Sequence, residues 1–185
     1  MTFKTAIIDP PWPYADASSH KKLSGYVKCA VTQYKTISMQ DLKSLPIGDV
    51  VTDYVFLWAV GPFVASGEAS GLLKSWGFVP RSMLFWYKNT GLGVGYWFRG
   101  DCEPIIFASK KGSPAIRTNE RSLFSSKRLR HSAKPETLHE IAEKHFPGPY
   151  LELFGRRGRE GWTVLGNEAP GDGKDIRESL QCLKD

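Results

Sequence analysis

The chain reads, from its fifth residue, Thr5-Ala6-Ile7-Ile8-Asp9-Pro10-Pro11-Trp12, a mostly apolar run followed by an acid, two prolines and a tryptophan. Proline has no N–H with which to continue a strand ladder, so we expect a buried strand that ends at Asp9. Open α/β sheets bind ligands at the carboxyl ends of their strands, and Asp9 would lie at such an end. An ordinary strand-ending turn with an aromatic lid is the alternative interpretation.

The same segment offers three groups that suit a planar base with an exocyclic amine. Asp9 supplies a carboxylate, and the stiff backbone of Pro10 and Pro11 gives the Pro10 carbonyl a fixed direction. Trp12 supplies a flat apolar face beside the carboxylate. The N6 amine of adenine has two hydrogens to donate to two such acceptors. We therefore treat Asp9, Pro10, Pro11 and Trp12 as candidate catalytic residues.

Length and composition predict a globular chain. The 185 residues are 41% hydrophobic and 24% charged, which favours one domain, placed at residues 1–168, with a C-terminal tail at 169–185. A net charge of +6 permits a polyanionic partner without requiring one. No apolar run reaches membrane length and no signal-peptide pattern begins the chain, so we expect a cytoplasmic protein without membrane contact.

The cysteines and histidines predict neither disulfides nor a metal centre. Cys29, Cys102 and Cys182 are odd in number and far apart, which favours free thiols in a reducing compartment. The four histidines form no metal-ligand spacing with them. We expect no metal site.

Strand and helix patterns alternate along the rest of the chain. Apolar runs predict strands at residues 54–60, 82–88, 104–108, 150–154 and 162–165. Capping residues, prolines and glycines bound predicted helices at 38–45, 63–76 and 135–145, and the tail ends in a further short helix. This order indicates an α/β fold, a Rossmann-like doubly wound sheet that is mostly parallel with an antiparallel component.

Two long segments between these elements carry aromatic side chains. Residues 13–38 hold Tyr34 among polar residues, and we interpret them as a lid over the site, with a disordered surface loop as the alternative. Residues 89–100 are rich in glycine and aromatics and include Trp97, which would offer a stacking surface. We add Glu103 to the candidate substrate-binding residues.

Basic residues follow in residues 109–134. Lys127, Arg128 and Arg130 form the densest group, and the pair Lys110-Lys111 lies just ahead of it. Such charges mark either a solvated face or the path of a phosphate backbone. We take them as candidate phosphate contacts.

Four motifs, in this order, resemble one enzyme family. They are Asp9-Pro10-Pro11-Trp12, Gln33-Tyr34-Lys35-Thr36-Ile37, Lys134-Pro135-Glu136, and Leu151-Glu152-Leu153-Phe154-Gly155-Arg156 with Trp162-Thr163-Val164-Leu165-Gly166-Asn167-Glu168. Together they resemble the adenine-N6 methyltransferases with an Asp-Pro-Pro-Trp motif. That family includes the catalytic subunit of the eukaryotic mRNA adenosine methyltransferase and small bacterial and phage DNA adenine methyltransferases. Its permuted motif order, with the catalytic strand before the cofactor strand, is similar to the order here.

The resemblance implies S-adenosyl-L-methionine as the cofactor and assigns the site residues. Asp9 would contact the target amine and the methionine amino group, and Lys134 would pair with the methionine carboxylate. The ribose and adenine pocket would be lined by Glu152, Gly155, Arg156, Asn167 and Glu168. A target base in a duplex must leave the stack, and Trp12, Tyr34 or Trp97 would stack on it.

The implied function is methyl transfer to the N6 amine of adenine in nucleic acid. DNA is favoured by analogy with small bacterial or phage-encoded enzymes, RNA remains the alternative, and a homodimer stays open. An inactive nucleic-acid-binding partner of the same fold is a second hypothesis, although such partners usually lack the motif's Asp or Trp. A Rossmann-like nucleotide enzyme of another kind is a third, and the chain has neither a G-x-G-x-x-G fingerprint nor a Walker loop.

Overall fold

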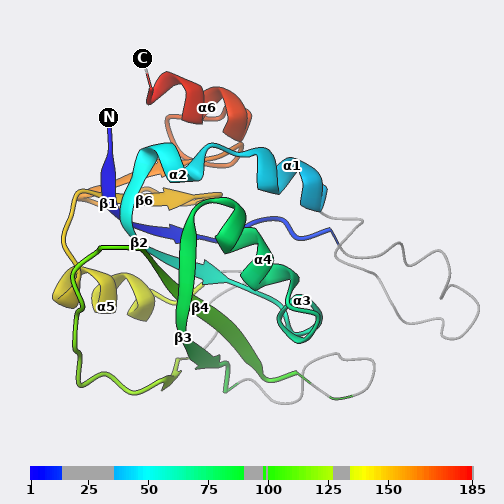
Figure 1. Cartoon of the computed structure of the whole chain (residues 1–185), viewed down its shortest axis with the longest axis vertical. Coiled ribbons are helices and arrows are strands. Elements are labelled where there is room, and N and C mark those ends of the chain that lie inside the picture. The colour runs from blue at the N-terminus through cyan, green and yellow to red at the C-terminus, as the bar shows by residue number, and fades with distance from the viewer. Residues whose placement is uncertain (14–35, 90–97, 99, 127–133, 185) are drawn as a thin grey trace, which may run out of the picture.

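The computed structural model describes residues 1–13, 36–89, 98, 100–126 and 134–184. Within them, one mixed sheet contains β1 (Phe3–Ile8), β2 (Val51–Trp58), β3 (Phe78–Tyr87), β4 (Cys102–Lys110), β5 (Leu123–Ser125), β6 (Tyr150–Leu153) and β7 (Trp162–Leu165). The helices are α1 (Met39–Ser44), α2 (Ile47–Val50), α3 (Gly61–Ala65), α4 (Glu68–Ser75), α5 (Thr137–His145) and α6 (Ile176–Cys182). Figure 1 shows their arrangement.

The sheet order is β5-β3-β4-β2-β1-β6-β7. β1 runs parallel to both β2 and β6, β6 runs parallel to β7, and β3 runs parallel to β5, whereas β4 is antiparallel to its two neighbours. The predicted mostly parallel α/β sheet with an antiparallel component is therefore confirmed. Ile8 aligns with Leu57 of β2 and with Leu153 of β6, so these parallel strands end together at one edge.

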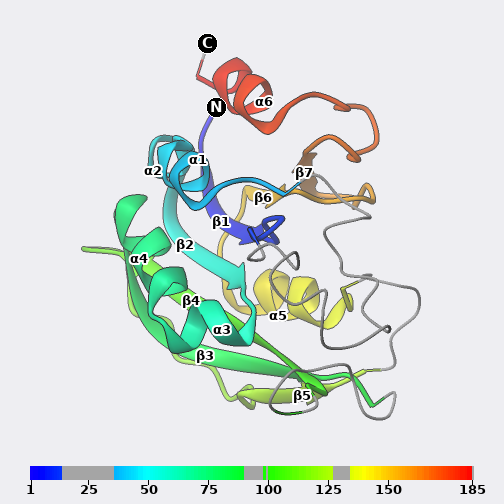
Figure 2. The same ribbon diagram turned by 90° about the vertical axis from the view of Figure 1, so that its right-hand side faces the viewer.

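The helices cover the two faces of the sheet unequally (Figure 2). One face carries a core built from α1, α2, α4 and α6, with Leu42, Leu72 and Leu180 packed against residues such as Ile8. Among the described helices, α5 supplies the opposite core, where Leu138 and Ala142 meet aromatic residues of β2 and β4. The central strands are continuous apolar runs in the sequence, as expected for strands whose two faces are both buried.

Several boundaries differ from those that the sequence predicts. The single helix expected at 63–76 is two helices, α3 and α4, because Gly67 takes the left-handed conformation, with φ 80°, between them. β3 begins at Phe78 rather than at residue 82, with an irregular register between Pro80 and Ser82. β5 and α2 were not expected. Both are very short elements, and four or fewer residues give no clear period.

The C-terminal residues form part of the packed fold. The predicted short helix is α6, capped by the Asp175 side chain, which accepts the Arg177 N–H. Ile176 and Leu180 are 2% and 0% exposed and belong to the larger core. The described helices are too short or too polar to cross a membrane. Cys102 and Cys182 are free and exposed, whereas Cys29 lies outside the described residues.

A candidate active site at the carboxyl edge of the sheet

The segment after β1 turns sharply at the edge where the parallel strands end. Asp9 follows directly on Ile8, and its N–H donates to the Leu153 carbonyl of β6. The Trp12 N–H donates to the Pro10 carbonyl at 2.8 Å, an i to i+2 bond that closes a three-residue turn. The predicted end of the strand is confirmed, and the turn fixes the direction of the Pro10 carbonyl.

Trp12 lies inside the protein. Its side chain is 3% exposed, its Nε1–H donates to the Trp58 carbonyl at 3.1 Å, and its ring stacks on Phe63 at 4.9 Å between centroids. The indole therefore presents no free face at the site. It ties the turn to the end of β2 and to α3.

Charged side chains alternate in sign across the sheet edge from Asp9. Lys134, ahead of α5, places Nζ 2.9 Å from Asp9 Oδ2 and 3.2 Å from Glu103 Oε2. Glu103 Oε1 is in turn 2.7 Å from Lys88 Nζ. Asp9 follows β1, Lys88 follows β3, Glu103 is near the start of β4 and Lys134 precedes α5. We call these four residues the charge network. Sheet pairing therefore assembles groups that are far apart in sequence.

Two tryptophans lie beneath the lysines of the charge network. Lys134 Nζ is 5.0 Å from the Trp58 ring centroid, and Lys88 Nζ is 5.9 Å from that of Trp86. The two indoles meet edge to face at 6.0 Å. Cations over aromatic faces are attracted to the ring quadrupole, so the indoles favour the charged lysines where water is scarce.

The environment moves the pKa values of the charge network in different directions. Burial raises the pKa of Asp9 above its ordinary value, and Lys134 opposes this rise only in part. Burial also acts to raise the pKa of Glu103, but Lys134 and Lys88 together outweigh it and leave that pKa below the ordinary value. For Lys134, burial favours the neutral form, yet Asp9 and Glu103 raise its pKa. Asp9 is thus the carboxylate that accepts a proton more readily.

A second group of candidates lies where β6 and β7 end, next to Asp9. Glu152 of β6 lies 3.0 Å from His139 Nε2 of α5, and Arg156 Nε is 3.4 Å from Glu168 Oε2. Asn167 and Glu168 are exposed. Arg156 and Glu168 follow the paired strands β6 and β7, whose ends are aligned at Leu153 and Leu165. The structure thus brings these candidates together beside the charge network.

Glycines allow the close approach of these two strand ends. A side chain at Gly155 would place Cβ 2.4 Å from Val164 Cγ1. Gly166 has φ 141°, and its Cβ would lie 3.0 Å from the Phe154 Cα, while Phe154 itself has φ 64°. These positions need glycine for packing and conformation, so Gly155 acts here through the backbone.

The other predicted substrate residues fall outside the described part of the chain. Tyr34, Trp97, Lys127, Arg128 and Arg130 are among these, so their roles stay predictions. Lys110 lies at the end of β4 opposite Glu103, where Nζ donates to the Gly48 carbonyl at 2.5 Å. The predicted phosphate contact of Lys110 stays a prediction. Along β4, Lys110 is seven residues from Glu103 of the charge network, roughly 24 Å of strand.

Sequence reasoning missed Lys88, Trp58 and His139. Lys88 and Trp58 end or follow strands, as Asp9 does, so a strand-end position was the available signal. His139 is one of several polar residues on α5, and its pairing with Glu152 depends on how the helix packs on β6. No local pattern indicates that contact.

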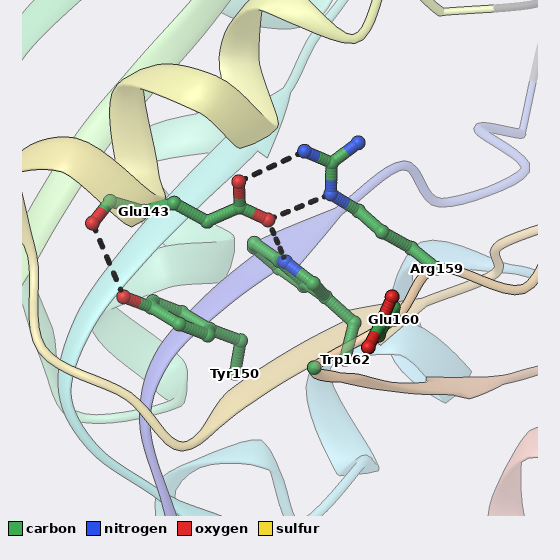
Figure 3. A pocket seen from close by; sticks show the side chains of 6 residues that line it. Glu143, Tyr150, Arg159, Glu160 and Trp162 are labelled. Carbon is green, nitrogen blue, oxygen red and sulfur yellow. Dashed lines mark hydrogen bonds and ion pairs between the residues drawn. The ribbon is translucent and has the colours of Figure 1, made fainter.

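A hollow at the opposite edge is lined by Glu143, Tyr150, Arg159 and Trp162 (Figure 3). The Glu143 carboxylate accepts Arg159 Nε–H at 2.7 Å and Trp162 Nε1–H at 2.6 Å, and the Tyr150 O–H donates to the Phe146 carbonyl at 2.8 Å. Tyr150 and Trp162 begin β6 and β7, so this hollow is separate from the charge network. Its polar groups bond one another and support α5.

A mostly parallel sheet, with charged residues gathered where its parallel strands end, defines a Rossmann-like α/β protein, a class in which ligands generally bind at that edge. The sequence profile of the MT-A70 family matches residues 3–168. This chain belongs to the MT-A70 family.

Two curated proteins give the comparison more detail. The chain is 28% identical over 184 residues to the type II methyltransferase M.MunI of a Mycoplasma species, covering 91% of this chain and 78% of that protein. It is 26% identical over 181 residues to the N6-methyladenosine RNA methyltransferase MTA1 of Pyricularia oryzae, covering 90% of this chain. This chain spans 46% of MTA1, about half its length.

Proposed function

We propose that this chain, an adenine-N6 methyltransferase acting on nucleic acid, uses S-adenosyl-L-methionine to methylate DNA. The observation that carries the mechanism is the Asp9 carboxylate, which lies at the carboxyl end of β1 with Lys134 Nζ at 2.9 Å. DNA is supported by the M.MunI relative, of which the chain covers 78%, against 46% of the RNA enzyme.

The side chains at the edge suit the proposed cofactor. Its methionine part carries an ammonium and a carboxylate, and Asp9 and Lys134 present the complementary charges side by side. Glu152 offers a carboxylate for ribose hydroxyls, and the exposed Asn167 offers an amide that can both donate and accept. When bound, the cofactor supplies an electrophilic methyl group on a sulfonium centre.

Asp9 and Pro10 make the amine a better nucleophile. The N6 lone pair of adenine is conjugated with the ring and is therefore poorly nucleophilic. Hydrogen bonds from its two N–H groups to the Asp9 carboxylate and the Pro10 carbonyl favour a pyramidal nitrogen with an available lone pair. The Pro10 oxygen has a second lone pair beside the one that accepts the Trp12 N–H.

The same two acceptors stabilise the positive charge that develops on nitrogen as the methyl group arrives. Holding the amine in line with the methyl group adds a proximity effect. The methylated amine is acidic until it loses its proton, so Asp9 need not be a strong base. Burial raises the pKa of Asp9, which makes its carboxylate a better acceptor of that proton.

Trp12 acts from beneath the site in this proposal. Its bond to the Trp58 carbonyl and its stacking on Phe63 hold the turn that carries Asp9 and Pro10. The target adenine must be flipped out of a duplex or taken from a single strand. Stacking on it is left to Tyr34 or Trp97.

Transfer of tritium from labelled S-adenosyl-L-methionine tests the function. Duplex DNA, single-stranded DNA and RNA of matched sequence serve as acceptors, and N6-methyladenine is identified in the digested product. We expect transfer to DNA, lost in Asp9→Ala. Transfer to RNA alone would favour the MTA1-like alternative. A wild-type chain that binds nucleic acid without transferring any label would be the inactive partner.

A further inference from the structure

The C-terminal segment folds back onto the end of β7. The matched family region ends at residue 168, and residues 169–184 continue beyond it. In this segment Asp172 Oδ2 accepts the Gly166 N–H at 2.9 Å and the Ser179 O–H at 2.6 Å. One carboxylate oxygen thus joins the turn after β7 to α6.

The Gly166 N–H is the first backbone donor beyond β7. The neighbouring Leu165 carbonyl is taken by the Phe154 N–H at 2.7 Å, and the Gly166 carbonyl by the Ala169 N–H at 2.9 Å. The Asp172 N–H also donates back to the Ala169 carbonyl. The Asp172 carboxylate therefore closes a compact turn, and a hydrogen bond to an ionised acceptor is the strong kind.

This turn carries Asn167 and Glu168, whose side chains are exposed. Their positions therefore depend on the backbone that presents them. Gly166, with φ 141°, can adopt conformations that other residues cannot, so the turn needs an external restraint to hold one of them.

Ser179, the second hydrogen-bond partner of the Asp172 carboxylate, lies in the core. Ser179 is 3% exposed on α6, between the buried Ile176 and Leu180. Arg177 of the same helix lies 2.8 Å from Asp41 of α1. Asp172 is thus held by a helix that is itself fixed.

We infer that Asp172 is a positioning residue for the cofactor-binding turn Gly166–Glu168. It touches no cofactor and acts through the Gly166 backbone, which sets where Asn167 and Glu168 meet the ribose and adenine. This inference rests on the proposed function, which places S-adenosyl-L-methionine at this edge. It assigns a role in the site to a segment outside the matched family region.

Three variants separate positioning from general stability. Asp172→Ala removes the acceptor, and Asp172→Asn keeps an oxygen that can accept both bonds. Leu72→Ala, at a buried position on α4, lowers stability without changing α6 or Asp172. Calorimetry with S-adenosylhomocysteine, at a temperature where every variant is folded, gives the cofactor affinity. Amide hydrogen exchange at Gly166 reports the bond itself.

We expect Asp172→Ala to weaken S-adenosylhomocysteine binding by about tenfold, the worth of one charge-assisted hydrogen bond, and to speed exchange at Gly166. Asp172→Asn should restore most of both, and Leu72→Ala should lower Tm with little change in affinity. DNA affinity should stay at the wild-type value throughout.

Unchanged affinity in Asp172→Ala would overturn the inference. So would an equal loss of affinity in Leu72→Ala, because Asp172 would then act only through general stability. A wild-type chain that binds no S-adenosylhomocysteine would overturn the proposed function and the cofactor role of the turn together. Exchange at Gly166 would still report whether Asp172 holds the backbone.

Discussion

Asp9, Lys134, Glu103 and Lys88 form a line of alternating charge in which each inner residue contacts two partners. Lys134 therefore lies between two carboxylates. Its positive charge lowers the pKa of Asp9, and the negative charge of Glu103 raises it. Asp9 is proposed to act on the target amine as well as on the cofactor, and Lys134 on the cofactor alone, so their variants should differ in which property they lose.

Replacing Asp9 by alanine is expected to abolish methyl transfer, and Asp9→Asn to cripple it, while the fold survives. The physical reason is the loss of the charged acceptor for the target amine, since an amide is neutral. Tritium transfer gives the activity and circular dichroism gives the fold. Turnover of Asp9→Ala within about tenfold of wild type would refute the assigned role.

Lys134→Ala is expected to weaken cofactor binding more than nucleic-acid binding. A charge-assisted hydrogen bond to a carboxylate contributes roughly 1.5–3 kcal/mol, about ten- to a hundredfold in affinity. Calorimetry with S-adenosylhomocysteine and a DNA-binding titration measure the two affinities. Equal losses in both would show that Lys134 supports the site as a whole.

The acid limb of the kcat profile is expected to report the ionisation of Asp9. Burial raises the Asp9 pKa. As the pH is lowered, activity should therefore begin to fall while the pH is still above the ordinary carboxyl range. Lys134 lowers this pKa and Glu103 raises it. Lys134→Met should therefore move the limb to higher pH and Glu103→Gln to lower pH, both at saturating cofactor. Shifts in the same direction would contradict the assignment.

Among the elements, α5 runs between the two edges of the sheet at which the strands begin and end. Its amino end follows Lys134, and its last turns carry Glu143, which holds Arg159 and Trp162 at the opposite edge. Arg159 also reaches Glu136 at the start of the helix, at 2.5 Å. Arg159, in the connection between β6 and β7, therefore binds both ends of α5.

Glu143→Gln is expected to lower stability at neutral pH by about 1 kcal/mol, a figure that allows for the part-exposed ion pair. Arg159 and Trp162 hold the Glu143 pKa at about 2, below its ordinary value. Because the folded pKa is depressed, this stabilisation is present above the ordinary glutamate pKa and is lost as pH falls toward about 2. Urea unfolding of both proteins at neutral and acidic pH measures it.

Glu140→Gln provides a matched control, since Glu140 is exposed on the same helix. The difference in unfolding free energy between wild type and Glu143→Gln should shrink with acidification, and that for Glu140→Gln should stay near zero. A difference that grew as the pH fell would contradict the ion-pair explanation.

At the scale of the whole molecule, the net charge of +6 explains nucleic-acid binding only if the basic residues lie near the proposed site. The sheet places the proposed site at one edge, and Lys110 lies at the other. Lys127, Arg128 and Arg130 precede Lys134 in the sequence, which keeps them the preferred candidates for phosphate contacts.

Neutralising Lys127, Arg128 and Arg130 together is expected to flatten the plot of log K against log salt for duplex DNA. Each lost phosphate contact should reduce the slope by about one unit, with cofactor affinity unchanged. Lys4→Gln, at an exposed position near the start of β1 and so at the opposite edge from Asp9, is the control and should leave the slope intact. A wild-type slope in the triple variant would make these charges a solvated face.

The sequence alone predicts the strand at 5–9, the strand at residues 162–165, the capped helix at Ser38 and the overall α/β alternation. These features depend on local signals: apolar runs, proline, and a serine whose side chain caps its own helix. The family resemblance also rests on contiguous motifs. Local patterns missed the break at Gly67 and the strand β5, where short segments take their conformation from their neighbours.

Tertiary structure alone determined the charge network, the burial of Trp12, the pairing of Glu152 with His139 and the restraint of Gly166 by Asp172. Each joins residues on different elements, so no spacing along the chain encodes it. Sheet order decides which strand ends are neighbours, and the packing of α5 and α6 decides which polar side chains reach them. The sequence identified the candidate site residues, and the fold determined which other groups contact and position them.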